Sequence, residues 1–220
     1  MKFEILSDMA VQAIVDGYHR DAVASFIASL ERLHEFFLEA TCRKNGIDRA
    51  AFSAGWKLLS SQAERQLGAF VASYLIETGS APRLLPRNQT EFRNDVVHKG
   101  KFPERGETIR FGQAVADCVL PILSLLRSEP YAAYVQKLVG ERLRDRHQQA
   151  WDAGVRASTC SLNTLFSLTY VELETDIEAA VTKRAARPDM GRAVGEMHLL
   201  RAVFDIIRQS SETPPPEDPA

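Results

Sequence analysis

The stretch "YHRDAVASFIASLERLHEFFLEATCRK", residues 18–44, decides the fold class of this chain. Apolar side chains recur in it at intervals of three and four residues, which is the period of an amphipathic α-helix. These side chains are Val23, Phe26, Ile27, Leu30, Leu33, Phe37 and Leu38. Asn45 and Gly46 end the pattern, because both residues favour helix termini. The stretch therefore predicts one long helix with a buried side.

Similar helical patterns fill most of the chain after this helix. We expect helices from an N-cap at Asp48 through about Leu59, and over residues 61–78, 88–99 and 104–127. Gly79 and Gly100 suit the left-handed position that follows a helix, and Pro121 predicts a kink. Strand patterns are almost absent from residues 1–127, so the sequence predicts an all-α protein whose first part is a helical bundle.

The remainder of the chain reads as an extension of this bundle over residues 128–209. Helical patterns return at residues 130–147, 175–186 and 192–209, whereas residues 158–173 are ambiguous between a short helix and a pair of strands. Residues 210–220 contain four prolines and no apolar face, so we expect a disordered tail.

Composition excludes several classes of protein. The chain has 220 residues, 45% of them hydrophobic and 25% charged, and its net charge of −2 gives no overall basic field for nucleic acid or membranes. The three cysteines form no CxxC pair, which argues against a disulfide framework or a zinc–thiolate site. The sequence lacks the common nucleotide-binding and hydrolase motifs, a signal-peptide pattern and an apolar run of about 18 residues. We therefore expect a cytoplasmic protein without a membrane span.

Polar residues crowd one predicted helix end in "EFRNDVVHKGKFPERGE", residues 91–107. Asn94 and His98 are four residues apart and so lie on one helix face, with Arg93 beside them. The chemistry of these residues fits the cleavage of RNA without a metal. That reaction needs proton transfer from the 2′-OH, proton transfer to the leaving oxygen, and a cation that holds the phosphate. Histidine titrates near neutral pH, arginine donates bidentately to phosphate, and asparagine can orient either group.

The run Arg93-Asn94-Asp95-Val96-Val97-His98 resembles the signature helix of the HEPN superfamily, in which an Arg and a polar residue precede a His by four to six positions. The following segment, residues 99–103, also looks like the usual continuation. The similarity extends in layout over about residues 15–127, including "GYHRDAVASFIASLE" at residues 17–31. Many members are metal-independent endoribonucleases of toxin–antitoxin or anti-phage systems, and their site is typically shared by two motif helices across a dimer.

The resemblance implies catalytic roles for Arg93 and His98, supported by Asn94, in a homodimer that needs no metal or organic cofactor. Lys99, Lys101 and Arg105 would bind the RNA. Residues 83–110 carry seven Lys and Arg and four Asp and Glu, which leaves a local charge of +3 for phosphates. The expected products have a 2′,3′-cyclic phosphate and a 5′-OH. An antitoxin or another regulatory protein is a further expected partner.

Other interpretations of the same residues stay open. Arg93 and His98 are also compatible with an inactive HEPN-like module for dimerisation or RNA binding. Asp95 can pair with Lys99 or hold His98, of which we favour the pair. Gly100 stands where superfamily members that are modified by partner nucleotidyltransferases carry a Tyr, so the sequence does not support that regulation.

A di-iron helical bundle is a remote alternative. An acid and a His three residues apart occur as Glu31 with His34 and as Asp95 with His98, with Glu64 and Glu107 as further carboxylates. We expect Glu31 and His34 instead to lie on the exposed face of their helix.

Overall fold

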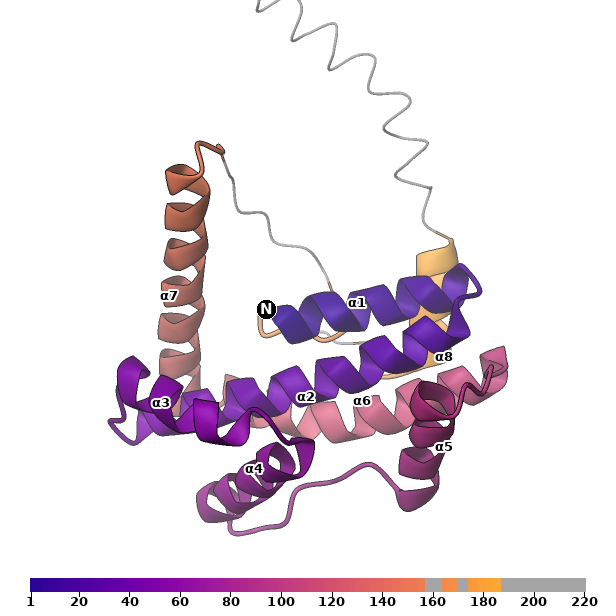
Figure 1. The fold of residues 1–220 in the computed structure, drawn as a ribbon, viewed down its shortest axis with the longest axis horizontal. Helices are drawn as coiled ribbons and strands as arrows, with labels where there is room; N and C mark the ends of the chain where they lie inside the picture. Colours follow the sequence, from indigo (N-terminus) through magenta and orange to yellow (C-terminus); the bar gives the residue numbers. More distant parts are fainter. Residues whose placement is uncertain (157–163, 170–173, 187–220) are drawn as a thin grey trace, which may run out of the picture. The chain divides into compact units, whose positions relative to one another are not determined.

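The computed structural model describes residues 1–156, 164–169 and 174–186, and within them the protein is all-α, as the sequence predicts (Figure 1). One compact unit runs from Met1 to Arg184, and the chain divides from this first unit at Ala185. The helices in the described residues are α1 (Lys2–Val15), α2 (His19–Lys44), α3 (Arg49–Leu59), α4 (Ala63–Thr78), α5 (Arg87–His98), α6 (Arg105–Arg127), α7 (Tyr131–Asp152) and α8 (Ile177–Ala185).

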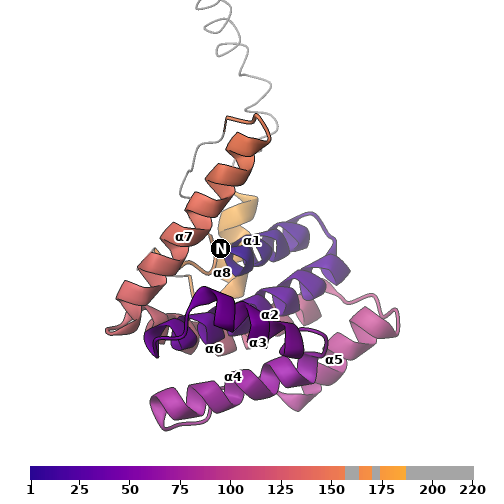
Figure 2. The same ribbon diagram turned by 60° about the vertical axis from the view of Figure 1, so that its left-hand side comes forward.

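The predicted long helix, α2, is the centre of the first unit. It packs against α1, α4, α5, α6 and α7, and α1 and α6 run along its length (Figures 1 and 2). Its aromatic side chains Phe26, Phe36 and Phe37 are almost completely buried. Because each contributes a large apolar area, this helix supplies much of the burial that stabilises the bundle.

Helix α1 was not predicted from the sequence. It forms an antiparallel hairpin with α2 through a turn at Gly17, whose φ of 82° is in the left-handed region (Figure 1). The Ser29 hydroxyl donates to the Phe3 carbonyl at 2.8 Å and ties the two helices together. Phe3, Val11 and Ile14 are buried in the shared core.

Several predicted helix ends are confirmed. The Asp48 side chain accepts a hydrogen bond from the Ala51 N–H at 2.8 Å, as an N-cap does. Gly79 follows α4 with a φ of 71°, and Gly100 follows α5 with a φ of 75°. Pro121 lies on the exposed side of α6. Among the described helices, α6 alone is long and apolar enough to cross a membrane by composition, and half of that stretch is buried, as in a core helix.

Described parts of the predicted extension pack against the bundle. Leu165 and Phe166 are buried, and the Leu168 N–H donates to Glu4 of α1 at 2.8 Å. Helix α8 starts beside α6, where Gln113 accepts from the Ile177 N–H at 3.1 Å. The domain division at residue 127 stays a prediction. The expected helix at residues 192–209, the tail and most of residues 158–173 lie outside the described residues.

Candidate functional site

Hydrogen bonds to backbone carbonyls hold the C-terminal end of α5, the helix that carries the polar cluster. The Lys99 and Lys101 N–H groups both donate to the Asp95 carbonyl, at 3.2 and 3.0 Å. The Arg20 Nε donates to the Val96 carbonyl at 3.3 Å and brings a cation from the start of α2 to this end. Because the carbonyls of a last helical turn lack intrahelical partners, these contacts fix where α5 stops.

One side of α5 faces the core and the other faces solvent. Val96 is fully buried, and the Phe92 ring packs against Phe111 with centroids 5.7 Å apart. Asn94 and His98 project from the opposite side, one turn apart, with Asn94 half-buried and His98 exposed. The predicted pair therefore shares one accessible helix face.

Arg93, predicted from the sequence to lie beside this pair, occupies a different environment. It lies about 100° round the helix axis from Asn94, and its side chain is half-buried. Its Nε is buried, and within the described residues Arg93 has no hydrogen-bond or ion-pair partner. A buried donor without an acceptor costs about 1–3 kcal/mol.

The three cations predicted to bind substrate each face a carboxylate. Lys99 pairs with Asp95 at 2.9 Å, as we favoured, and Lys101 pairs with Glu107 at 2.7 Å. Arg105 makes a bidentate contact with Glu178 of α8, at 2.5 and 3.2 Å. The hydrogen bonds that they donate to these carboxylates raise the pKa of Lys99 and of Arg105. The same arrangement lowers the pKa of Glu107, chiefly through its hydrogen bond with Lys101.

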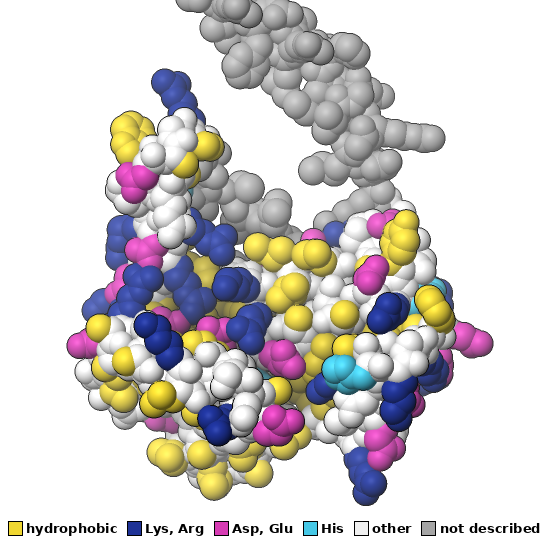
Figure 3. Space-filling model, viewed as in Figure 1, with side chains coloured by type: hydrophobic (Ala, Val, Ile, Leu, Met, Phe, Trp, Pro, Cys, Tyr) yellow, Lys and Arg dark blue, Asp and Glu magenta, His cyan; other side chains and the backbone are white. Residues whose placement is uncertain are grey.

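The local charge of +3 is therefore less available to phosphate groups than the sequence indicates. Arg83 and Arg87 are also paired, with Asp117 and Glu91. Of the seven cations in residues 83–110, Arg93 and Arg110 remain without an ion pair to a described residue. On the face shown in Figure 3, Lys and Arg side chains are interspersed with Asp and Glu around α5.

Two residues of this site come from distant parts of the chain. Arg20 meets Val96 across 76 positions, and Glu178 meets Arg105 across 73. The sequence carries a signal for neither contact, because each depends on how whole helices pack. The stretch that contains Arg20 was part of the HEPN resemblance, but no role followed from it.

The ligands of the di-iron alternative do not assemble. The prediction that His34 is exposed is wrong: the side chain is 7% exposed and stacks on Phe70 with ring centroids 3.8 Å apart. Burial lowers its pKa to about 3. Asp95 and Glu107 are engaged with lysines, and no group of three possible metal ligands occurs among the described residues.

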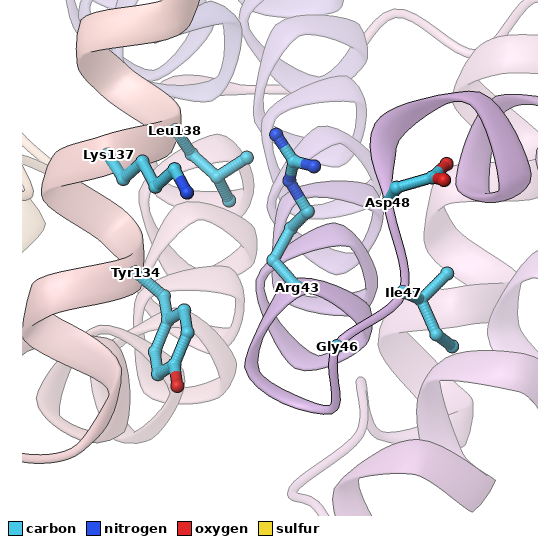
Figure 4. Close-up of a pocket in the computed structure, with 7 residues that line it drawn as sticks. All are labelled: Arg43, Gly46, Ile47, Asp48, Tyr134, Lys137 and Leu138. Atoms are coloured by element: carbon cyan, nitrogen blue, oxygen red, sulfur yellow. The ribbon is translucent and has the colours of Figure 1, made fainter.

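Two cavities lie at the other end of α2, beside α3 and α7. In the smaller, of about 210 Å³, Lys137 and Leu138 of α7 point toward Arg43, while the Asp48 carboxylate points away (Figure 4). Arg43 is paired with Glu141. This volume is below the roughly 300–1,000 Å³ of ordinary small-molecule sites.

The larger cavity, of about 300 Å³, lies against the stacked rings of Phe52 and Trp56 on α3. Two of the arginines around it are in ion pairs, Arg142 with Glu39 and Arg49 with Asp145. Neither cavity includes a residue of α5.

Comparison of the chain with protein-family models, with curated proteins and with solved structures finds no significant match.

Proposed function

We propose that this protein is a metal-independent endoribonuclease, with His98 and Arg93 as catalytic residues and Asn94 in support. The observation that carries the proposal is the lack of internal partners for these side chains of α5 among the described residues. Each lacks an ion-pair or hydrogen-bond partner among the described residues, although charged neighbours on the same segment are paired. Groups reserved for a substrate are expected to lack internal partners, because a partner would have to be displaced.

The proposed chemistry uses the ordinary properties of these side chains. The His98 imidazole takes the proton of the 2′-OH, whose oxygen attacks the adjacent phosphorus and expels the 5′-oxygen. Arg93 donates to the phosphate oxygens as charge develops on them. The leaving oxygen takes a proton, and the products end in a 2′,3′-cyclic phosphate and a 5′-OH.

A homodimer would supply a second His98 for the second proton transfer. One imidazole per chain cannot be base and acid in the same step, whereas two motif helices brought together provide both. The setting that fits such an enzyme is a cytoplasmic toxin–antitoxin or anti-phage system, with an antitoxin or regulatory protein as partner. These expectations rest on the HEPN-like motif.

An inactive RNA-binding or dimerisation module is the second candidate. The pairing of Lys99, Lys101 and Arg105 leaves few free cations for phosphate beside the motif, which favours the dimerisation form of this module over RNA binding.

RNA cleavage in EDTA separates the two candidates. Wild type is compared with His98→Ala and Arg93→Ala, and with His147→Ala as a control for an exposed histidine on α7. The enzyme proposal predicts a loss of about 10²–10⁴ in rate for His98→Ala and about 10²–10³ for Arg93→Ala, with the control unchanged. Circular dichroism and light scattering establish that the variants keep the fold and subunit number. Equal rates in all four proteins would refute the catalytic assignment.

A further inference from the structure

Phe102 follows the polar cluster and is the most exposed large hydrophobic side chain among the described residues, at 84%. Burying a phenylalanine stabilises a protein by about 1.5–3 kcal/mol, so folding alone gives no reason for this position. An exposed aromatic ring instead offers two free faces for stacking.

The exposure of Phe102 follows from anchored neighbours on both sides. The Lys101 N–H is bound to the Asp95 carbonyl at 3.0 Å, and its ammonium lies 4.8 Å from the centroid of the Phe92 ring. On the other side, Pro103 is buried. The loop is therefore fixed before and after Phe102, and the ring is held outward.

Phe102 lies close to His98 along the chain. Phe102 is four positions after His98, so their Cα atoms are at most about 14 Å apart. Proteins that bind single-stranded nucleic acid combine cations for the backbone with aromatic rings for the bases. Lys99 and Lys101 lie in the same short segment, where an RNA phosphate would compete for them with their carboxylate partners, Asp95 and Glu107.

We propose that Phe102 stacks on an unpaired base next to the cleaved phosphate, and that the substrate is single-stranded RNA, such as a loop or an end. Inside a duplex the faces of each base are covered by its neighbours, so an RNA helix cannot present one to the ring. This inference rests on the proposed function for the place of the cleaved phosphate.

Binding of a labelled RNA tests the stacking directly. Fluorescence anisotropy in EDTA compares a 12-nucleotide single strand with the blunt duplex of the same sequence, using His98→Ala protein so that the probe stays intact. In that background, Phe102→Ala is expected to weaken binding of the single strand roughly 5- to 150-fold, and Phe102→Trp to preserve it. Duplex binding is expected to stay unchanged.

Trp151→Ala is the matched control, because Trp151 is an aromatic residue of α7 with 76% exposure. If Phe102→Ala binds the single strand as tightly as Trp151→Ala, the stacking inference is wrong. It is also wrong if Phe102→Ala disrupts subunit association in the absence of RNA, measured by light scattering, since the ring then serves a protein contact.

Cleavage kinetics of Phe102→Ala without the His98 change separate this inference from the proposed function. A stacking residue away from the reacting atoms is expected to raise KM with little change in kcat. If wild type cleaves RNA and Phe102→Ala has the same KM and RNA affinity as wild type, the stacking inference is wrong and the proposed function stands. If wild type never cleaves RNA but Phe102→Ala weakens RNA binding, the proposed enzymatic function is wrong and the stacking inference stands.

Discussion

The stability of the protein is expected to fall below neutral pH because of His34. This side chain lies inside the bundle, stacked on Phe70, and its Nε2 is buried without a hydrogen-bond partner among the described residues. Burial lowers its pKa from 6.5 to about 3, and no charged neighbour contributes to the shift. Protonation is therefore much easier in the unfolded chain than in the folded protein.

The sign and size of the effect follow from this difference. A folded pKa below the unfolded value gives stability that is present above about pH 6.5 and is lost as pH falls toward 3. At pH 5 the folded protein keeps His34 neutral while the unfolded chain is protonated. The free energy of unfolding should then be lower by about 2 kcal/mol than at pH 7.5 through this group alone.

Urea unfolding of wild type and His34→Leu at pH 7.5 and pH 5 measures this contribution. Leucine has a similar volume and does not titrate, so the variant should lose about 2 kcal/mol less between the two pH values. Gln149→Leu, a change at an exposed position of α7 that does not titrate, should keep the pH dependence of wild type. An identical pH dependence in wild type and His34→Leu would refute the reasoning.

Two further predictions concern helix packing and charge. An added Cβ at Gly112 would lie 2.8 Å from the Phe26 ring, so Gly112→Ala should lower the free energy of unfolding by about 1–3 kcal/mol in urea. Gly140→Ala, where the nearest atom is a flexible side-chain end at 3.6 Å, should instead raise it by about 0.5–1 kcal/mol; equal effects would contradict this. Glu178→Gln removes the carboxylate that faces Arg105, so the affinity for RNA should rise. A plot of the logarithm of the RNA-binding constant against the logarithm of the salt concentration should become steeper by roughly one. An unchanged slope would mean that Arg105 does not reach phosphate.

Local patterns predicted much of the helical framework. The apolar spacing of residues 18–44 predicted α2, and glycines at positions 79 and 100 predicted where helices end. The surface pair of Asp95 and Lys99 was also predictable, since residues four apart on a helix are neighbours. In each case, the residues that determine the structural feature lie within a few positions of it in the sequence.

The sequence predictions were wrong where packing between helices determines burial and charge pairing. His34 is polar, but it lies between Leu30 and Phe37 at helical spacing, and position on the buried face outweighed residue type. The charge count in residues 83–110 predicted free cations, whereas α8 brings Glu178 onto Arg105 from outside that segment. Contacts between helices that are far apart in sequence determine which charges remain available.

One comparison tests the proposed catalytic role of α5 most directly. A single-stranded RNA and the DNA strand of the same sequence are incubated with the protein in EDTA, and the ends of any fragments are identified by mass. The proposal predicts that the RNA alone is cut, that its fragments carry a 2′,3′-cyclic phosphate and a 5′-OH, and that His98→Ala abolishes the products. Cleavage of the DNA, 5′-phosphate ends, or full activity in His98→Ala would contradict it.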